Sequence, residues 1–152
     1  MINTRIAYTQ EDGSVAIVCP SPEFIAQAGT IEKLARCSMP LGTHFEVLDV
    51  ADIPTDRYFR NAWRLGEPLS QSIETDMPAA REIHMDALRK LRNKKLEELD
   101  IPYTIAFERR NSGEQETIGI KKQALRDMPA SVDLSSLSEQ ELKNYMPDIL
   151  SS

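Results

Sequence analysis

Three short apolar runs near the start of the chain alternate with turn-forming residues. Residues 6–9 and 15–19 are rich in β-branched side chains and flank the segment Glu11-Asp12-Gly13-Ser14. An Asp-Gly pair between two such runs predicts a β-hairpin. Residues 45–50 alternate apolar with polar side chains, which is the period of a half-buried strand. These patterns predict a small antiparallel sheet.

A helix is predicted between the second and third of these strands, over residues 22–37. Ser21 is a capping residue, and Pro22 follows it at the first helical position, where a missing N–H does no harm. Apolar side chains then recur at helical spacing, although Gly29 weakens the middle and marks a point where the helix can break. The order β-β-α-β therefore predicts a sheet with one covering helix.

A short amphipathic helix is predicted after the third strand. Phe59, Ala62 and Trp63 form its apolar side, and the opposite side carries arginines. These arginines are Arg57, Arg60 and Arg64. The next stretch, with Gly66, Pro68 and small hydroxyl residues, shows no periodicity, so we expect a linker or mobile loop at residues 66–75.

The second half of the chain has helical periodicity throughout. Asp76 caps a predicted helix that runs to Leu99, in which Pro78 is tolerated because it lies in the first turn. Asp100 precedes Ile101-Pro102, so a capping residue is again followed two positions later by a proline, as in Asp76-Met77-Pro78. We therefore expect a bend there and a new helix through residues 103–107.

Two further helices complete the predicted pattern. Residues 114–128 have helical periodicity that ends before Pro129. Ser138 and Glu141 have the Ser-x-x-Glu spacing of a capping box, which predicts a short last helix. The fold class is thus α+β, a β-β-α-β unit followed by a C-terminal helical region with one long helix. We expect a small α+β unit at residues 1–65 and a helical region at 76–152, or one continuous domain that includes both.

The composition favours a globular protein without a membrane partner. The chain has 152 residues, of which 41% are hydrophobic, enough for one core. No apolar run approaches the roughly 18 residues that span a bilayer, and no basic segment with an apolar core opens the chain. We therefore expect the protein to start in the cytosol. The net charge of -6 argues against a general nucleic-acid coat.

The two cysteines are predicted to be reduced. Cys19 and Cys37 have neither metal-like nor redox-like spacing, and such cysteines in a cytosolic protein usually stay as thiols. We interpret both as small buried hydrophobes, with a disulfide between them as the alternative.

Few residues offer catalytic chemistry. Cys37 and His44 would make a nucleophile and base if the fold joined them, but no oxyanion-forming glycine turn lies beside either. His84 would need metal ligands three or four residues away on its helix, whereas Glu82 and Asp86 lie two residues away. We therefore predict no catalytic residue, no metal site, no cofactor and no enzymatic activity.

A basic cluster on the long helix supplies candidate nucleic-acid-binding residues. Its members are Arg81, Arg89, Lys90, Arg92, Lys94 and Lys95. A basic helix can follow phosphates, which favours this hypothesis. However, acidic residues interleave or follow the cluster and its members do not share one face, a pattern typical of a solvated helix with internal ion pairs. Nucleic acid is therefore disfavoured as a partner.

A second group of residues is a candidate for binding a protein partner. It consists of Arg57, Arg60, Arg64 and Trp63. Tryptophan and arginine are among the residues that dominate interface hot spots. The alternative for Trp63, the only tryptophan, is that it plugs the junction between the sheet and the helical half.

Three segments resemble small accessory proteins of tailed bacteriophages and prophages. Asp56-Arg57-Tyr58-Phe59-Arg60-Asn61-Ala62-Trp63 resembles a P-x-D-R-x-F-R-x-A-W segment of proteins encoded among virion genes. Met77-Pro78-Ala79-Ala80-Arg81-Glu82-Ile83-His84 is similar to a helix that follows in the same proteins. Lys122-Gln123-Ala124-Leu125-Arg126-Asp127-Met128-Pro129 resembles an R-Q-x-L-R-D-x-P segment of phage tail and tail-fibre assembly proteins.

This resemblance implies a virion-associated protein, either a small structural component near the tail or neck or an assembly factor. It implies other phage structural proteins as partners, a location in the virion or the host cytoplasm, and no catalytic residues. The ring symmetry of virion parts adds a homo-oligomer to these expectations. The second hypothesis is a phage-encoded regulator or host-defence inhibitor that binds nucleic acid or a host protein through the basic helix.

Overall fold

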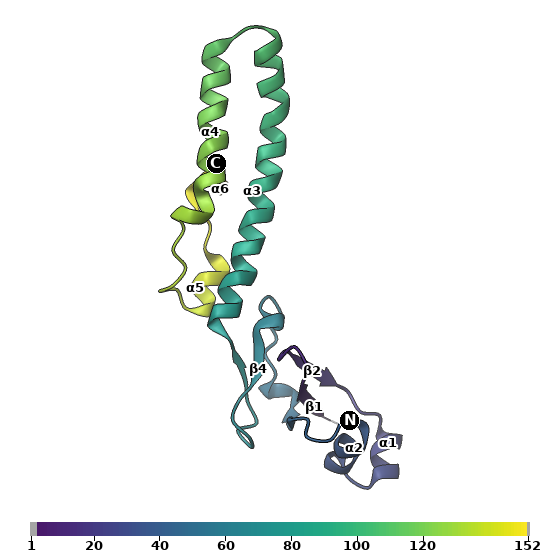
Figure 1. Ribbon diagram of the computed structural model, residues 1–152. Helices are drawn as coiled ribbons and strands as arrows, with labels where there is room; N and C mark the ends of the chain where they lie inside the picture. Colours follow the sequence, from purple (N-terminus) through teal and green to yellow (C-terminus); the bar gives the residue numbers. More distant parts are fainter. Residues whose placement is uncertain (1–2, 152) are drawn as a thin grey trace. The chain divides into compact units, whose positions relative to one another are not determined.

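The chain is an α+β protein made of two compact units. The computed structural model describes residues 3–151, and its units are Met1–Ala80 and Arg81–Ser152. The described part of the first unit holds both small antiparallel sheets, and that of the second is helical (Figure 1). The long helix α3 (Met77–Glu108) begins in the first unit and continues into the second. The predicted fold class is therefore confirmed.

The larger sheet has three strands in the order β2-β1-β3, paired antiparallel. They are β1 (Thr4–Thr9), β2 (Val15–Val18) and β3 (Phe45–Asp49). The predicted hairpin joins β1 to β2. Gly13 has a φ of +81° in its turn, and Oδ1 of Asp12 accepts a hydrogen bond from the backbone N–H of Ser14 at 2.9 Å. Local turn chemistry thus produces this part of the fold.

Two short helices, α1 (Pro22–Ala28) and α2 (Ile31–Ser38), form where the sequence predicted one helix with a weak point. Gly29 ends α1 with a φ of +89°, a left-handed conformation that is costly for residues with a Cβ. Thr30 then caps α2 by accepting a hydrogen bond from the N–H of Lys33 at 3.2 Å. The break therefore lies at the predicted glycine.

The prediction of a short helix after β3 is wrong. The chain instead forms two 3₁₀ turns and a strand, which are η1 (Val50–Asp52), η2 (Arg60–Ala62) and β4 (Trp63–Leu65). Oδ1 of Asp56 accepts a hydrogen bond from the N–H of Tyr58 at 3.0 Å, so Asp56 makes a local turn. Trp63 is extended and buried against the sheet, because its packing outweighs the helical spacing of its neighbours.

The predicted linker at residues 66–75 is a folded hairpin loop within the first unit. Its end forms strand β5 (Ile73–Thr75), which pairs antiparallel with β4. The backbone N–H of Leu69 donates a hydrogen bond to Oε1 of Glu46 on β3 at 2.6 Å. This segment is thus attached to the sheet, and the boundary between the units follows Ala80.

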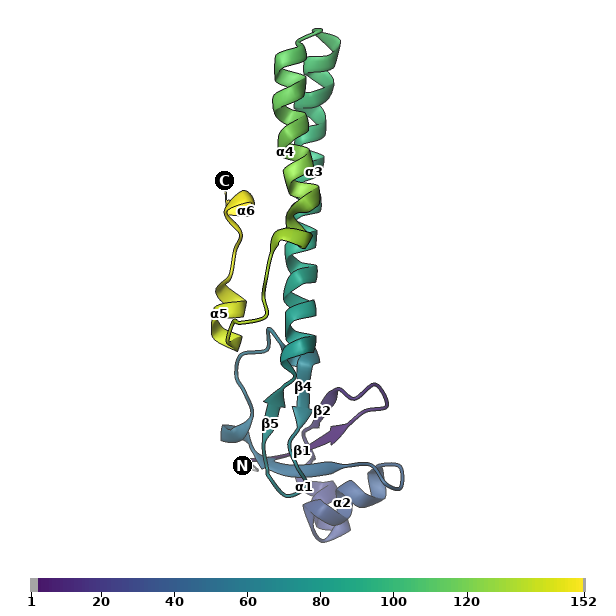
Figure 2. The ribbon, with the colours of Figure 1, turned by 60° about the vertical axis from the view of Figure 1, so that its left-hand side comes forward.

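In the second unit, α3 and α4 (Ser112–Ser131) lie side by side as a helical hairpin (Figures 1 and 2). The predicted bend at Asp100 and the predicted end before Pro129 are both wrong, because α3 continues through Pro102 and α4 through Pro129. A proline inside a helix removes one backbone hydrogen bond and costs roughly 3 kcal/mol. Packing between the two helices therefore outweighs this cost.

Each helix of the hairpin carries a series of heptad positions, and we call the two series together the seam. On α3 these positions are Leu88, Arg92, Lys95, Leu99, Pro102 and Ala106; on α4 and its C-cap they are Gln115, Ile118, Lys122, Leu125, Pro129 and Val132. All of them are buried or half-buried. Their spacing alternates between three and four residues, as in a coiled coil.

Two short helices, α5 (Glu139–Asn144) and α6 (Asp148–Ser151), complete the second unit (Figure 2). The predicted capping box is confirmed, since Oγ of Ser138 accepts from the N–H of Glu141 and the Glu141 carboxylate accepts from the N–H of Ser138. Leu150 of α6 is buried with Leu88 and Leu125 of the hairpin. The C-terminal segment therefore belongs to the core of this unit.

Candidate functional site

Trp63 is a core residue of the first unit. Its side chain is 1% exposed and belongs to a cluster with Ala7, Val15 and Leu48 of the three-stranded sheet. Phe59 is also buried. The structure therefore places the indole of this candidate partner-binding residue inside the unit, where a partner does not reach it.

The three arginines near Trp63 differ in their surroundings. The guanidinium of Arg64 donates to the carbonyl oxygens of Asn61 (3.2 Å) and Trp63 (2.8 Å) and lies 3.3 Å from the carboxylate of Asp76. Arg57 and Arg60 are exposed. The candidate partner-binding group is thus reduced to these two arginines at the surface.

The basic cluster of α3 does not form one basic face. Arg81 donates hydrogen bonds to the carbonyl oxygens of Leu134 (3.1 Å) and Ser135 (2.8 Å), which ties the C-terminal segment to α3. Arg89 pairs with Asp86 at 2.7 Å.

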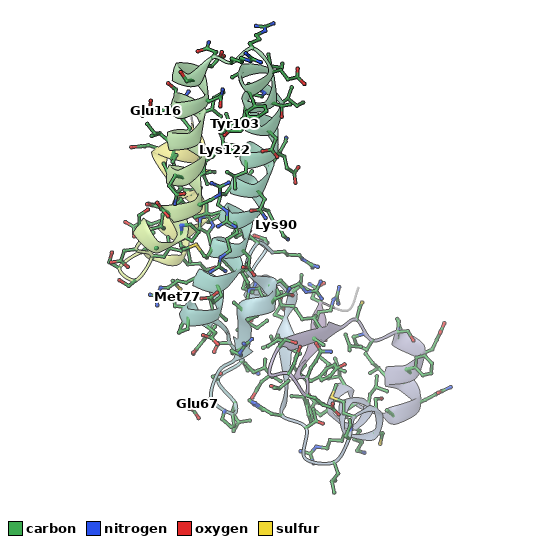
Figure 3. The ribbon with its side chains drawn as sticks, turned by 45° about the horizontal axis from the view of Figure 1, so that its top comes forward. Glu67, Met77, Lys90, Tyr103, Glu116 and Lys122 are labelled. Atoms are coloured by element: carbon green, nitrogen blue, oxygen red, sulfur yellow. The ribbon has the colours of Figure 1, made fainter. Side chains whose placement is uncertain are left out.

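The remaining members of the cluster have different roles. Arg92 donates to the side-chain oxygen of Asn93, and Lys95 is half-buried in the seam. Lys90 and Lys94 are exposed, and Figure 3 labels Lys90 on α3. A phosphate backbone would therefore meet few of these cations together.

The histidines have local partners. His84 is 3% exposed, and its Nε2 lies 2.9 Å from the carbonyl oxygen of Tyr145. Because a carbonyl oxygen only accepts, Nε2 must carry the proton and donate. Nε2 of His44 lies 3.4 Å from the carboxylate of Glu46. His84 thus links α3 to the C-terminal segment, and among residues 3–151 no three metal-ligating side chains gather in one place.

Both cysteines are free and exposed, so the prediction that they are buried is wrong. Cys37 lies in the last turn of α2, where Ala35 instead supplies the buried position. Cys19 follows the end of β2 and lines a surface groove with Phe24 of α1. This groove has a volume of about 480 Å³ and is lined mainly by apolar side chains.

The part of the hairpin near the α3–α4 turn exposes large apolar side chains. We call this set the distal apolar surface; its members are Ile101, Tyr103, Ile105, Phe107 and Ile120. The exposed fractions of Ile101, Phe107 and Ile120 are 69%, 65% and 65%. Exposed apolar side chains that gather on one part of a protein mark sites of interaction.

Helical geometry divides the α3 members of this surface between two flanks of the seam. Residues four apart share a face of a helix, so Ile101 and Ile105 lie on one flank and Tyr103 and Phe107 on the other. The ammonium of Lys122 lies 5.3 Å from the centre of the Tyr103 ring and pairs with Asp100 (Figure 3). The Tyr103 flank is therefore tied to α4.

The flank of the hairpin that carries Ile101 and Ile105 has an open groove. Its volume is about 400 Å³, and its lining residues are Lys95, Glu98, Leu99, Ile120, Lys121, Ala124, Leu125 and Ile149. Ile101 and Ile105 follow Glu98 by three and seven residues and so continue its side of α3. The groove and these isoleucines therefore lie on the same flank, and the groove is lined by both apolar side chains and the charged Lys95, Glu98 and Lys121.

Among residues 3–151 no helix is both long enough and apolar enough to cross a bilayer. No protein-family model, curated protein or solved structure matches the chain significantly.

Proposed function

We propose that this chain is a non-enzymatic structural or tail-assembly accessory protein of a bacteriophage particle and acts by protein–protein contact. The observation that carries the proposal is the distal apolar surface. Ile101, Phe107 and Ile120 leave most of their side chains in water, although each is large and apolar. The phage assignment is supported by the three segments that resemble virion-associated proteins.

Contact with a partner would stabilise a complex through burial of this surface. Removing one large apolar side chain from water contributes roughly 1.5–3 kcal/mol. A partner that covers several members of the surface therefore gains enough to offset part of the entropy lost on association. Arg57 and Arg60 of the first unit are additional candidates for polar contacts at a separate surface.

The basic helix gives less support to the nucleic-acid hypothesis. The guanidinium groups of Arg81, Arg89 and Arg92 already bind groups of the same unit. A partner that follows phosphates would have to displace these contacts. We therefore retain protein contact as the proposed function.

A phage that lacks the gene tests the proposal when it is complemented with variants. We expect the deletion to lower the yield of infectious particles and the wild-type chain to restore it. Phe107→Glu and Ile120→Glu should fail to restore the yield, because each places a charge where a partner must cover an apolar side chain. Glu139→Lys is the control, because this exposed residue lies on α5, outside the hairpin.

Helical content of the purified variants, measured by circular dichroism, shows whether the substitutions leave the hairpin folded. Full infectivity with folded Phe107→Glu and Ile120→Glu would contradict a role for the distal apolar surface. Normal particle yield from the deletion would contradict a role in assembly.

A further inference from the structure

Beside the seam, α3 carries a second heptad series, and we call the side of the helix on which this series lies the outward face. Its members are Ala87, Leu91, Lys94, Glu98, Ile101 and Ile105, spaced alternately by four and three residues. Each lies one residue before a seam position and is therefore rotated by about 100° around the helix axis. The three large apolar members are exposed, as are both charged ones. A helix with two heptad series packs in two directions, and α4 occupies only one of them.

The second series has mirror symmetry about Leu96. Ala87 and Ile105 are equally distant from Leu96, as are Leu91 and Ile101. The two central members, Lys94 and Glu98, are also symmetric but opposite in charge. When two copies of α3 run antiparallel with a two-fold axis at Leu96, apolar residues therefore meet apolar residues. Lys94 of each copy then meets Glu98 of the other.

We propose that the outward face of α3 binds a second copy of this chain in an antiparallel, two-fold symmetric dimer. The occupant is identified by charge complementarity as well as by the apolar positions. Before Leu96, the cations of α3 gather at residues 89–95, and after it the anions gather at residues 97–100. Antiparallel pairing places the basic segment opposite the acidic one, whereas parallel pairing in register places like charges together.

Lys94 and Glu98, the central charges, are not paired with each other or with another charge in the part of the chain that the structure describes. Lys94 precedes Glu98 by four residues, the less favourable order for pairing along one helix. Among the ion pairs of residues 3–151, neither of the two takes part. They are therefore available to a partner. The groove of about 400 Å³ beside Glu98 leaves space for side chains of the second helix.

This inference deepens the proposed function and rests only on its claim of protein contact through the hairpin. It assigns the Ile101 flank, including Ile120 in its groove, to a second copy and leaves the Tyr103 and Phe107 flank to other proteins. Phe107→Glu therefore tests contact with other proteins, whereas Ile120→Glu also weakens the dimer. The dimer is measured with purified chain, whereas the phage role is measured in particles, so failure of one is distinguishable from failure of the other.

Sedimentation equilibrium of the purified full chain, over a wide range of concentrations, tests the dimer. We expect a dimer that weakens as salt is added, because the central ion pairs are screened. Lys94→Glu and Glu98→Lys should each raise the dissociation constant about tenfold or more, because each creates two like-charge contacts in a symmetric dimer. The double variant Lys94→Glu/Glu98→Lys should restore the wild-type value.

A mixture of the two single variants supplies a second test. At positions 94 and 98, Lys94→Glu has two acidic side chains and Glu98→Lys has two basic ones. The mixture should therefore form a heterodimer, although each variant alone dimerises weakly. Glu139→Lys is the matched control, because it makes the same change as Glu98→Lys at an exposed residue of α5, outside the two helices of the hairpin.

Three outcomes would overturn the inference. The first is a wild-type chain that remains monomeric at every concentration. The second is a dimer that both single charge reversals leave intact while their helical content is unchanged. The third is a double variant that stays as weak as the single variants, since this would show that Lys94 and Glu98 do not face each other.

Discussion

Trp63 connects the two sheets of the first unit. It belongs to β4, and its side chain packs into the cluster formed by Ala7, Val15 and Leu48. Helical spacing alone places it on a short helix with Phe59, but burial of the largest apolar side chain in this unit determines the backbone instead. Burial of Trp63 is one of the two alternatives that the sequence offers for this residue, and it is the correct one. The sequence does not show which residues Trp63 packs against, because they are distant from it in the chain.

Trp63→Ala is expected to lower the free energy of unfolding of the first unit by about 3–5 kcal/mol, because the substitution leaves a cavity in the core. Chemical denaturation followed by circular dichroism measures this change. Leu41→Ala is the control at a fully exposed position and should change the same free energy by less than about 0.5 kcal/mol. Similar losses in both variants would contradict the assignment of Trp63 to the core.

Glu141 gives a prediction about pH. Hydrogen bonds from the hydroxyl and the backbone N–H of Ser138 lower the pKa of the Glu141 carboxyl below its ordinary value of 4.5. Because the pKa is lower in the folded state, the stabilisation is fully present above 4.5 and is lost as the pH falls through the lowered pKa. Ser138→Ala should therefore raise the pKa of Glu141 towards 4.5, as measured by NMR titration. An unchanged titration midpoint would contradict the capping box.

At the scale of elements, the sequence predicts turns and capping motifs correctly, whereas it misplaces the helix ends that it assigns to prolines. The hairpin at Gly13, the break at Gly29 and the capping box at Ser138 were all predicted correctly, because each depends on a few adjacent residues. Pro102 and Pro129 were interpreted as ends and proved to lie inside helices. The competing stabilisation comes from packing along the seam, which local sequence does not display.

Substitution of two glycines by alanine tests this account of the helices, because the free energy of unfolding should fall for one and rise for the other. Gly29→Ala should destabilise the first unit by about 1–2 kcal/mol, because its φ of +89° is costly for a residue with a Cβ. Gly119→Ala should stabilise the second unit by roughly 0.5–1 kcal/mol, because Gly119 lies inside α4 with free space around an added Cβ. Thermal unfolding measures both changes. Shifts of the same sign would contradict the assigned conformations.

The sequence did not predict the distal apolar surface, because the prediction did not separate the faces of the helix that carries it. Ile105 and Phe107 belong to the new helix that the sequence predicts through residues 103–107. Residues two apart on a helix point to different sides, so these two side chains cannot both face α4. This spacing was readable in the sequence and indicated more than one partner for α3.

At the scale of the whole molecule, the sequence predicted an α+β unit followed by a helical one, with the boundary too early. The segment at residues 66–75 lacks periodicity because it is a hairpin loop, and pairing between β4 and β5 adds it to the first unit. Of the candidate site residues, Arg57 and Arg60 are exposed as expected of a contact surface, whereas Trp63 is not. Surfaces are harder to predict than elements, because exposure depends on how the whole unit packs.

Calibrated mass spectrometry of sedimented fractions from infected cells, after chemical crosslinking, tests the central claim that this chain works by protein contact in a phage particle. We predict that the chain sediments with particles or their tail precursors at a fixed copy number. Crosslinks from Lys94 or Lys121 of the hairpin should reach another particle protein or a second copy. A chain found only in the slowly sedimenting fraction, without crosslinks to any particle protein, would contradict the account.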